Sequence, residues 1–258
     1  DRGGHRTGSR GQGLNMKTGA AGWLKRAVLQ REVLLTLVLV AVFVAVGSRV
    51  PRFVSQKSII NLLFDASTVG IVAVGLTIVV IGGGIDISVG STMAASAIMA
   101  GLVAQEDMNL WLVLGVGVAA GGLLGAFNAG LITKLQIPPI VATLATLSIF
   151  RGVLTELTKS ELIGGLPGSF TVIGKGRAAG VPIPVWIMIG LFVVSSLIMR
   201  FSGFGRVIYA IGSNEDAARL SGIAVKKYQA LTYVISGCVA GLAGVVFVAR
   251  NGTVLPTS

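Results

Sequence analysis

Long apolar runs separated by short polar stretches make up most of the chain. They lie at about 33–50, 59–81, 87–104, 110–133, 139–157, 185–200 and 228–249. Most approach the roughly 20 apolar residues that an α-helix needs to cross a bilayer core of about 30 Å. In lipid, where no water is available, a continuous apolar run satisfies its backbone N–H and C=O groups by forming the hydrogen bonds of a helix. The pattern therefore predicts an all-α, polytopic transmembrane helical bundle with about seven spans.

The composition supports a membrane protein and argues against a soluble one. Hydrophobic residues make up 53% of the chain and charged residues 12%, whereas soluble domains carry about 25% charged residues. The net charge of +11 comes from residues between the apolar runs, where anionic headgroups attract Lys and Arg. We therefore expect a lipid membrane as partner and no nucleic acid. The single Cys238 lies within a run and excludes an internal disulfide.

The N-terminus differs in character from the rest. Residues 1–15 are rich in Gly and Arg and show no hydrophobic periodicity. Met16 is expected to be the true first residue of the protein. We expect residues 1–30 to form a basic, disordered cytoplasmic segment. A membrane-embedded domain is expected to span residues 31–258 and to be incomplete at its C-terminus.

Charge also predicts an orientation. From Met16 on, the basic residues ahead of the first span are Lys17, Lys25, Arg26 and Arg31. The positive-inside rule then places the N-terminus in the cytoplasm. Across seven spans, the 106–107 turn falls outside and the basic segment 200–227 falls inside, as the rule expects. The segment that holds Arg49, Arg52 and Lys57 falls outside, against the rule.

Glycine is concentrated inside the apolar runs. Gly237 and Gly241 have the small-xxx-small spacing, which lets helix backbones approach closely in a membrane. We expect these glycines to pack helices into a compact bundle.

The first segment with chemical interest is 82–91, between two apolar runs. Three consecutive glycines at 82–84 break a helix, and Asp86 is positioned to cap the next one. One interpretation is a cytoplasmic turn with a helix cap. The other is a break at membrane depth, where it must be buried in protein or line a cavity. On the second interpretation Asp86 and Ser88 belong to a translocation path.

The second segment is 136–152. Pro138 and Pro139 suit the first turn of a helix, where no backbone donor is lost. Thr143 and Thr146 then place hydroxyls on a spanning helix. They either line a path for a hydroxylated solute or bond back to their own helix.

The third segment, 205–223, is predicted to be a polar cytoplasmic loop. Ser213 or Asn214 can cap a short helix that begins with Glu215 and Asp216, acids that suit the helix dipole. Ala217 and Ala218 are expected to face one way, and Gly222 to end the helix. The element is either a docking site for a partner protein or a plain connector.

Catalytic chemistry has little support in the sequence. The only histidine is His5, and no paired-Cys or His-x-x-His metal spacing occurs. Residues 168–176 faintly resemble a phosphate loop, but the spacing is wrong and Gly176 replaces the required Ser or Thr. We expect no cofactor, no metal and no ATPase site in this chain.

Together the three segments resemble the permease subunits of bacterial ABC importers for monosaccharides, in the ribose, xylose, galactose and rhamnose branch. The resemblance runs from about Arg31 to Arg250 and rests on 83–91, on 137–139 with 150–152, and on 209–223. Asp216-Ala217-Ala218 followed by Gly222 is similar to the Glu-Ala-Ala-x-x-x-Gly motif of ABC importers, with Asp for Glu. The downstream Ile-x-Leu-Pro of that motif is absent.

The resemblance implies a mechanism and a set of partners. A periplasmic sugar-binding protein delivers sugar to a permease dimer, of two like or unlike copies, in the bacterial inner membrane. Cytoplasmic ABC ATPase subunits then drive alternating access through coupling helices, here residues 214–222. Relatives usually continue for several segments beyond Arg250, so the chain is expected to be a fragment or truncated product.

Two rival functions stay open. A secondary transporter driven by an ion gradient also uses broken helices and an intramembrane acid, which would make Asp86 the coupling residue. The 215–222 loop discriminates against it, because an ion-driven transporter has no use for a docking helix. A receptor or assembly factor that docks through the same loop is the third reading.

Overall fold

A computed structural model describes residues 31–50, 52–159 and 161–254. The expected N-terminal segment 1–30 lies outside the described residues. The chain divides into two compact units between Ile59 and Ile60, and each is described by itself.

The first unit contains helix α2 (Arg31–Arg49) and the turn that follows it. Most apolar side chains of α2 are exposed. Ser58 Oγ donates to the Arg52 carbonyl at 2.7 Å and closes the turn. The rings of Phe43 and Phe53 pack with their centroids 5.1 Å apart.

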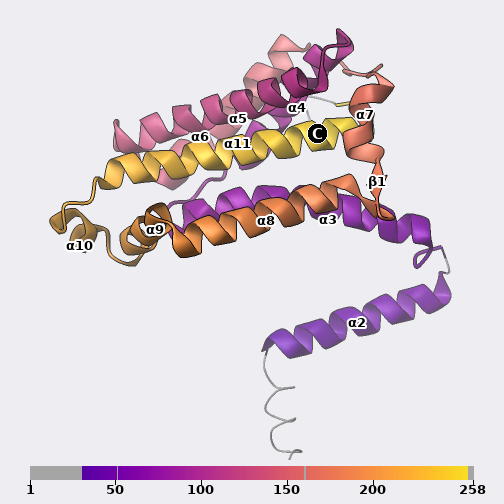
Figure 1. Ribbon diagram of the computed structural model, residues 1–258, viewed down its shortest axis with the longest axis horizontal. Helices are drawn as coiled ribbons and strands as arrows, with labels where there is room; N and C mark the ends of the chain where they lie inside the picture. Colours follow the sequence, from indigo (N-terminus) through magenta and orange to yellow (C-terminus); the bar gives the residue numbers. More distant parts are fainter. Residues whose placement is uncertain (1–30, 51, 160, 255–258) are drawn as a thin grey trace, which may run out of the picture. The chain divides into compact units, whose positions relative to one another are not determined.

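The second unit is built almost wholly from helices (Figure 1). In chain order the elements are α3 (Gln56–Ile81), α4 (Val89–Gln105), α5 (Leu110–Thr133), α6 (Pro139–Leu157), α7 (Gly168–Lys175), β1 (Arg177–Ala178), β2 (Val181–Pro182), α8 (Ile183–Phe201), α9 (Gly203–Ser213), α10 (Glu215–Leu220) and α11 (Val225–Asn251). The two short strands pair antiparallel. The first residues of α3 belong to the first unit.

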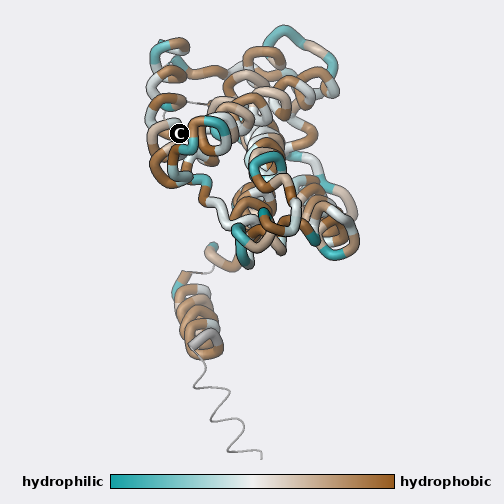
Figure 2. The backbone as a smooth tube through the Cα atoms, turned by 90° about the vertical axis from the view of Figure 1, so that its left-hand side faces the viewer, coloured by the Kyte–Doolittle hydropathy of each residue, from teal (hydrophilic) through white to brown (hydrophobic). Residues whose placement is uncertain are grey.

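The helical membrane fold predicted from the apolar runs is confirmed. All seven runs fall on helices: α2, α3, α4, α5, α6, α8 and α11. Within the described ranges, five helices are long and apolar enough to cross a membrane, namely α3, α5, α6, α8 and α11, while α2 and α4 are shorter apolar helices. In residues 60–254 the helices are largely hydrophobic along their length, and hydrophilic positions gather in the connections (Figure 2).

Helix α11 forms the centre of the second unit and packs against α4 and α5. Glycine makes the α5–α11 contact possible. A Cβ added at Gly121 would lie 2.1 Å from the Gly237 carbonyl oxygen, and one added at Gly237 would lie 2.3 Å from the Gly121 carbonyl oxygen. Gly241 fits against Gly117 in the same way. The predicted glycine packing is therefore confirmed. Close van der Waals packing of this kind holds helices together in lipid, where the hydrophobic effect does not drive their association.

The second unit has two distinct ends. One carries α9, α10 and the α5–α6 turn, and we call it the α10 end (Figure 1). The other carries α7 and the short strands. At that end Gln105 Nε2 donates to the Gly164 carbonyl at 2.7 Å, and Ile163 pairs with Val254.

Candidate functional site

The three glycines after α3 end that helix with a complete C-terminal cap. Gly83 has a φ of +80°, which favours glycine. The Gly84 N–H donates to the Val79 carbonyl at 2.9 Å and the Gly83 N–H to the Val80 carbonyl at 3.0 Å. These paired bonds are a Schellman motif, which satisfies carbonyls at a helix end. The predicted break at 82–84 is therefore confirmed.

The carboxylate of Asp86 lies inside the bundle. Its exposed fraction is 5%, and Ser88 is fully buried. Asp86 Oδ1 accepts hydrogen bonds from the Ser88 N–H at 3.0 Å and the Ser88 hydroxyl at 2.7 Å. Asp86 Oδ2 accepts from the Ser236 hydroxyl at 3.5 Å. Residue Ser236 lies 11 positions into α11, about 16 Å along its axis. Burial of this kind favours the break within the bundle over the surface turn.

Asp86 acts less as a helix cap than the sequence suggested. Helix α4 begins at Val89, and its N-cap residue is Ser88, whose side chain makes no capping bond. The carboxylate instead holds Ser88 in place, and the Asn128 amide donates to the Ser88 hydroxyl at 2.7 Å. Asn128 Oδ1 has no hydrogen-bond partner within the described part of the chain. The cluster thus joins the break to α5 and α11.

Tyr233 fixes the break from the side of α11. Its hydroxyl donates to the Ile85 carbonyl at 3.3 Å, and the residue is only 1% exposed. A Cβ added at Gly84 would lie 2.6 Å from the Tyr233 oxygen. Glycine is therefore needed at position 84 for the ring to reach the backbone.

The second segment forms the start of α6, as predicted. Pro138 is the N-cap and Pro139 the first helical residue. Thr143 and Thr146 are fully buried. The Thr143 hydroxyl donates to the Pro139 carbonyl at 2.8 Å, and the Thr146 hydroxyl to the Thr143 carbonyl at 3.2 Å. These bonds match the back-bonding alternative, so a role for either threonine in a solute path stays a prediction.

The third segment is not a loop with one short helix, as expected, but two helices in succession. Residues 203–213 form α9, whose buried positions Gly205, Ile208 and Ile211 recur every three residues. That spacing gives one apolar face to a helix. Helix α10 then begins at Glu215, capped by Asn214, whose Oδ1 accepts from the Ala217 N–H at 2.9 Å. Of the two predicted caps, Asn214 is therefore the one used.

Helix α10 ends in a second Schellman motif. The Ile223 N–H donates to the Ala218 carbonyl at 3.1 Å and the Gly222 N–H to the Arg219 carbonyl at 3.0 Å. Gly222 has a φ of +81°, so it ends the helix as predicted. A short helix closed at both ends keeps its shape without a long stretch of packing.

The expectation that Ala217 and Ala218 face one way was wrong. Ala218 is 4% exposed and packs in an apolar cluster with Ile211 and Val225, whereas Ala217 is exposed. Consecutive helical residues are rotated by about 100°, so neighbours cannot share one face. The outer face of α10 is formed by exposed side chains, including Asp216, Ala217 and Leu220.

Glu215 links α10 to the first turns of α11. Its carboxylate accepts from Arg219 at 2.6 Å and from Gln229 Nε2 at 3.2 Å. A Cβ added at Gly212 of α9 would lie 1.8 Å from the Ile81 carbonyl oxygen. The α9–α10 pair is therefore in direct contact with the end of α3.

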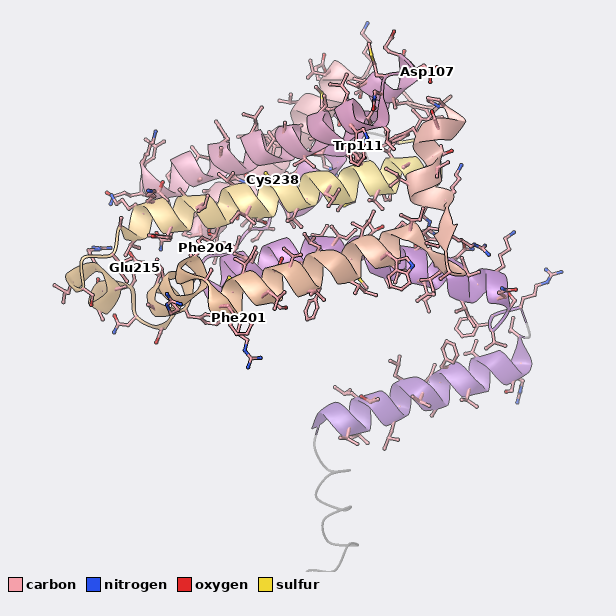
Figure 3. The ribbon with its side chains drawn as sticks, viewed as in Figure 1. Asp107, Trp111, Phe201, Phe204, Glu215 and Cys238 are labelled. Atoms are coloured by element: carbon pink, nitrogen blue, oxygen red, sulfur yellow. The ribbon has the colours of Figure 1, made fainter. Side chains whose placement is uncertain are left out.

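All three segments meet at one cavity of about 300 Å³ at the α10 end. We call it the end cavity. Its lining comes from the glycines 82–84, from the α5–α6 turn at 136–139, from Glu215 and Arg219, and from one side of α11. Tyr233 lines it and reaches the break. Figure 3 shows Glu215 on α10 at this end and Asp107 at the far end of the second unit.

Several residues of the site were not predicted from the sequence: Gln229, Tyr233, Ser236 and Asn128. The three on α11 recur at intervals of four and three, so they lie on one face of an otherwise apolar helix. That polar stripe is a signal that the sequence carries. Asn128 stands alone in an apolar run, and its contact with Ser88 depends on tertiary packing.

The fold and the site together define a polytopic helical membrane protein with a glycine break between α3 and α4 and a short capped helix, α10, at one end. The chain belongs to the family described as "Branched-chain amino acid transport system / permease component", which matches residues 58–258. It is therefore an integral membrane protein of an import-permease family. The predicted likeness to the permease subunits of sugar importers is confirmed.

The curated relatives include permease proteins named for ribose, autoinducer 2 and L-arabinose. The chain is 34% identical to the ribose import permease protein of Haemophilus influenzae over 89% of its own length and 71% of the relative. It is 33% identical to the autoinducer 2 import system permease protein of Klebsiella pneumoniae, over 90% and 67%. It is 31% identical to the L-arabinose transport system permease protein of Escherichia coli, over 83% and 65%. No solved structure matches.

Proposed function

We propose that this chain is the membrane-spanning subunit of an ATP-driven importer that carries a monosaccharide or a similar hydroxylated solute into the cytoplasm by alternating access. The relatives are named as permeases for ribose, autoinducer 2 and L-arabinose, and these names support the proposed substrate class. The chain contributes no ATPase site of its own. It lies in the bacterial inner membrane with its N-terminus in the cytoplasm.

The partners follow from this role. A cytoplasmic ABC ATPase binds at the α10 end, a periplasmic sugar-binding protein delivers substrate at the other end, and a second permease copy completes the path. Asn214, Glu215, Asp216, Ala217, Ala218 and Gly222 form the coupling element. Asp86 and Ser88, with Thr143 and Thr146, remain the candidates for the translocation path.

The observation that carries the proposal is helix α10. It is capped at both ends, packs through Ala218 onto α9 and α11, and presents an apolar side chain outward, with Leu220 90% exposed. An exposed large apolar side chain on a rigid element suits a protein contact. Glu215 of α10 contacts α11, and Gly212 of the adjoining α9 contacts the end of α3. A displacement of α10 by a bound partner would therefore be transmitted to the break at 82–88.

The test is co-purification of the chain with the ATPase encoded beside its gene. Ala217→Arg places a large charge on the exposed face of α10 without touching the buried Ala218. We expect the retained ATPase to fall about tenfold or more, as when a central contact of an interface is lost. Ala224→Arg is the matched control, because Ala224 is also exposed but lies beyond α10.

The outcomes separate the readings. Loss in Ala217→Arg and retention in Ala224→Arg support docking at α10. If the native chain retains no ATPase, the importer assignment fails. The ion-driven transporter then becomes the better reading, since Asp86 is a buried carboxylate with no ion pair among the described residues.

A further inference from the structure

A groove of about 500 Å³ runs between α3 and α8, away from the end cavity. The two helices lie alongside each other in the second unit (Figure 1). On the α3 side the exposed lining residues are small, Ala73 and Thr77, and on the α8 side Phe192 is exposed. The Thr77 hydroxyl donates back to the Ala73 carbonyl at 2.7 Å. Ser195 and Ser196 of α8 add two hydroxyls to a wall that is otherwise largely apolar. The volume falls in the range of ligand-binding clefts.

The length of the groove matches one leaflet of a bilayer. Its lining runs along α3 from Gly70 to Ile81, an axial rise of about 16 Å. A bilayer core of about 30 Å gives about 15 Å for each leaflet. Met188 closes the deep end, because its Sδ lies 2.3 Å from a Cβ added at Gly70. The groove is therefore open along about one acyl-chain length and closed at the end near Gly70.

The other end of the groove is polar and positively charged. Arg200 lies in the last turn of α8, is exposed and lines the groove. It forms no ion pair with any described carboxylate, since the two ion pairs found there involve Arg219 and Arg250. Its guanidinium lies 5.4 Å from the centroid of the Phe201 ring, a cation–π contact that leaves its charge available to an anion. Tyr209 of α9 lies at the same end and is 52% exposed. A guanidinium and a phenol that line the same end of one groove suit a phosphate headgroup at a membrane interface.

We propose that this groove binds one acyl chain of an anionic phospholipid from the leaflet at the α10 end, with its phosphate on Arg200 and Tyr209. The inference rests on the membrane fold and on the groove, and it is independent of the proposed transport function. The largely apolar wall selects an acyl chain, and the exposed cation selects a negative headgroup over a zwitterionic one. A bound lipid of this kind would brace α8 against α3.

The test is lipid retention by the purified chain. The protein is extracted in mild detergent, offered phosphatidylglycerol and phosphatidylethanolamine in equal amounts, and analysed by native mass spectrometry. We expect phosphatidylglycerol to be retained through washing that removes phosphatidylethanolamine. Arg200→Ala is expected to lower that retention by roughly tenfold or more, the loss of one charge-assisted contact. Lys134→Ala is the control, an exposed cation at the same end that does not line the groove.

A second variant tests the acyl-chain wall. Ala73→Trp fills the groove and is expected to abolish retention without removing the charge. If Ala73→Trp does not fold, Arg200→Ala carries the test alone, because its side chain is exposed. Equal retention of both lipids, or unchanged retention in Arg200→Ala, would overturn the proposal. So would a photo-crosslinker at position 73 that captures another protein segment in intact membranes.

Discussion

Asp86 is stabilised inside the bundle by hydroxyl and amide groups rather than by a cation. Ser88 supplies two donors to its carboxylate and Ser236 a third. Hydrogen bonds of this kind offset part of the cost of taking a polar group out of water. Because the three donors come from the break itself and from α11, any shift between these elements changes the environment of the acid.

The hydroxyl of Tyr233 is the residue-scale contact best suited to a mutational test. Tyr233→Phe keeps the ring in its buried site and removes the bond to the Ile85 carbonyl. We expect a stability loss of only about 1 kcal/mol, with ATPase co-purification unchanged. Under the proposed function, uptake of labelled sugar should fall several-fold, because the break loses its anchor on α11. Uptake assays in vesicles with the reconstituted complex measure this.

The control for that variant lies on the same helix. Tyr228→Phe removes a hydroxyl from a ring that packs on Phe204, with centroids 6.3 Å apart, and should transport normally. If Tyr233→Phe also transports normally, the Ile85 contact has no part in coupling. If it loses the ATPase as well, the tyrosine is needed for the structure of the α10 end.

At the residue scale the sequence indicated where the break lies but not what surrounds it. Three glycines before an aspartate predicted the end of α3 and an unusual acid. Ser236 and Asn128 lie 150 and 42 positions beyond Asp86 in the chain, and only folding brings them to the break. Contacts at such separation leave no local signal, apart from the polar stripe on α11.

At the scale of elements, the bundle depends on close backbone contact between α5 and α11. Gly121 and Gly237 face each other so closely that neither accepts a Cβ, and Gly125 meets the Tyr233 carbonyl in the same way. Packing of this kind supplies van der Waals contact over a long interface. The same interface positions Tyr233 and Ser236, so the glycines indirectly hold the site.

Gly121→Ala tests that interface with the smallest possible change. The new Cβ would lie 2.1 Å from the Gly237 oxygen, so α5 and α11 must separate. Overpacking of this kind costs about 1–3 kcal/mol. We expect a lower midpoint of thermal unfolding in detergent, measured by loss of monodisperse protein on heating. Gly115→Ala on the same helix is the control, because nothing lies within 4 Å of its added Cβ. Equal midpoints for the two variants would contradict the role of the glycines.

Element prediction succeeded where a long apolar run defined a helix, and for α10, whose cap and end residues were predicted, but it failed for α7 and α9. The seven runs gave α2, α3, α4, α5, α6, α8 and α11 because their length alone carries the signal. Helix α9 has 11 residues and α7 has eight, and both lie in stretches whose polar residues suggested loops. Their stability comes from packing on α8, α10 and α11, which a local pattern does not record.

For residues 60–254, the connections sort into two sets at opposite ends. The α3–α4 break, the α5–α6 turn and the α9–α10 pair share the α10 end, where the end cavity lies. The α4–α5 turn at Glu106 and Asp107 and the α7 region share the other. Alternation of this kind is what a chain that crosses a membrane repeatedly must produce. It agrees with the expected placement of 106–107 outside and 200–227 inside, which stays a prediction.

Single cysteines placed at the two ends test that orientation in intact cells. The background is Cys238→Ala, which removes the native thiol from α11 with a smaller residue. Glu106→Cys and Leu220→Cys both introduce a thiol at an exposed position. With the N-terminus in the cytoplasm, a membrane-impermeant maleimide should label position 106 in cells made permeable only at the outer membrane. Position 220 should react only after the inner membrane is opened, because the positively charged α10 end faces the cytoplasm. The reverse pattern would place α10 outside, where no ATPase can reach it, and would remove the physical basis of the importer proposal while leaving the fold and the lipid groove intact.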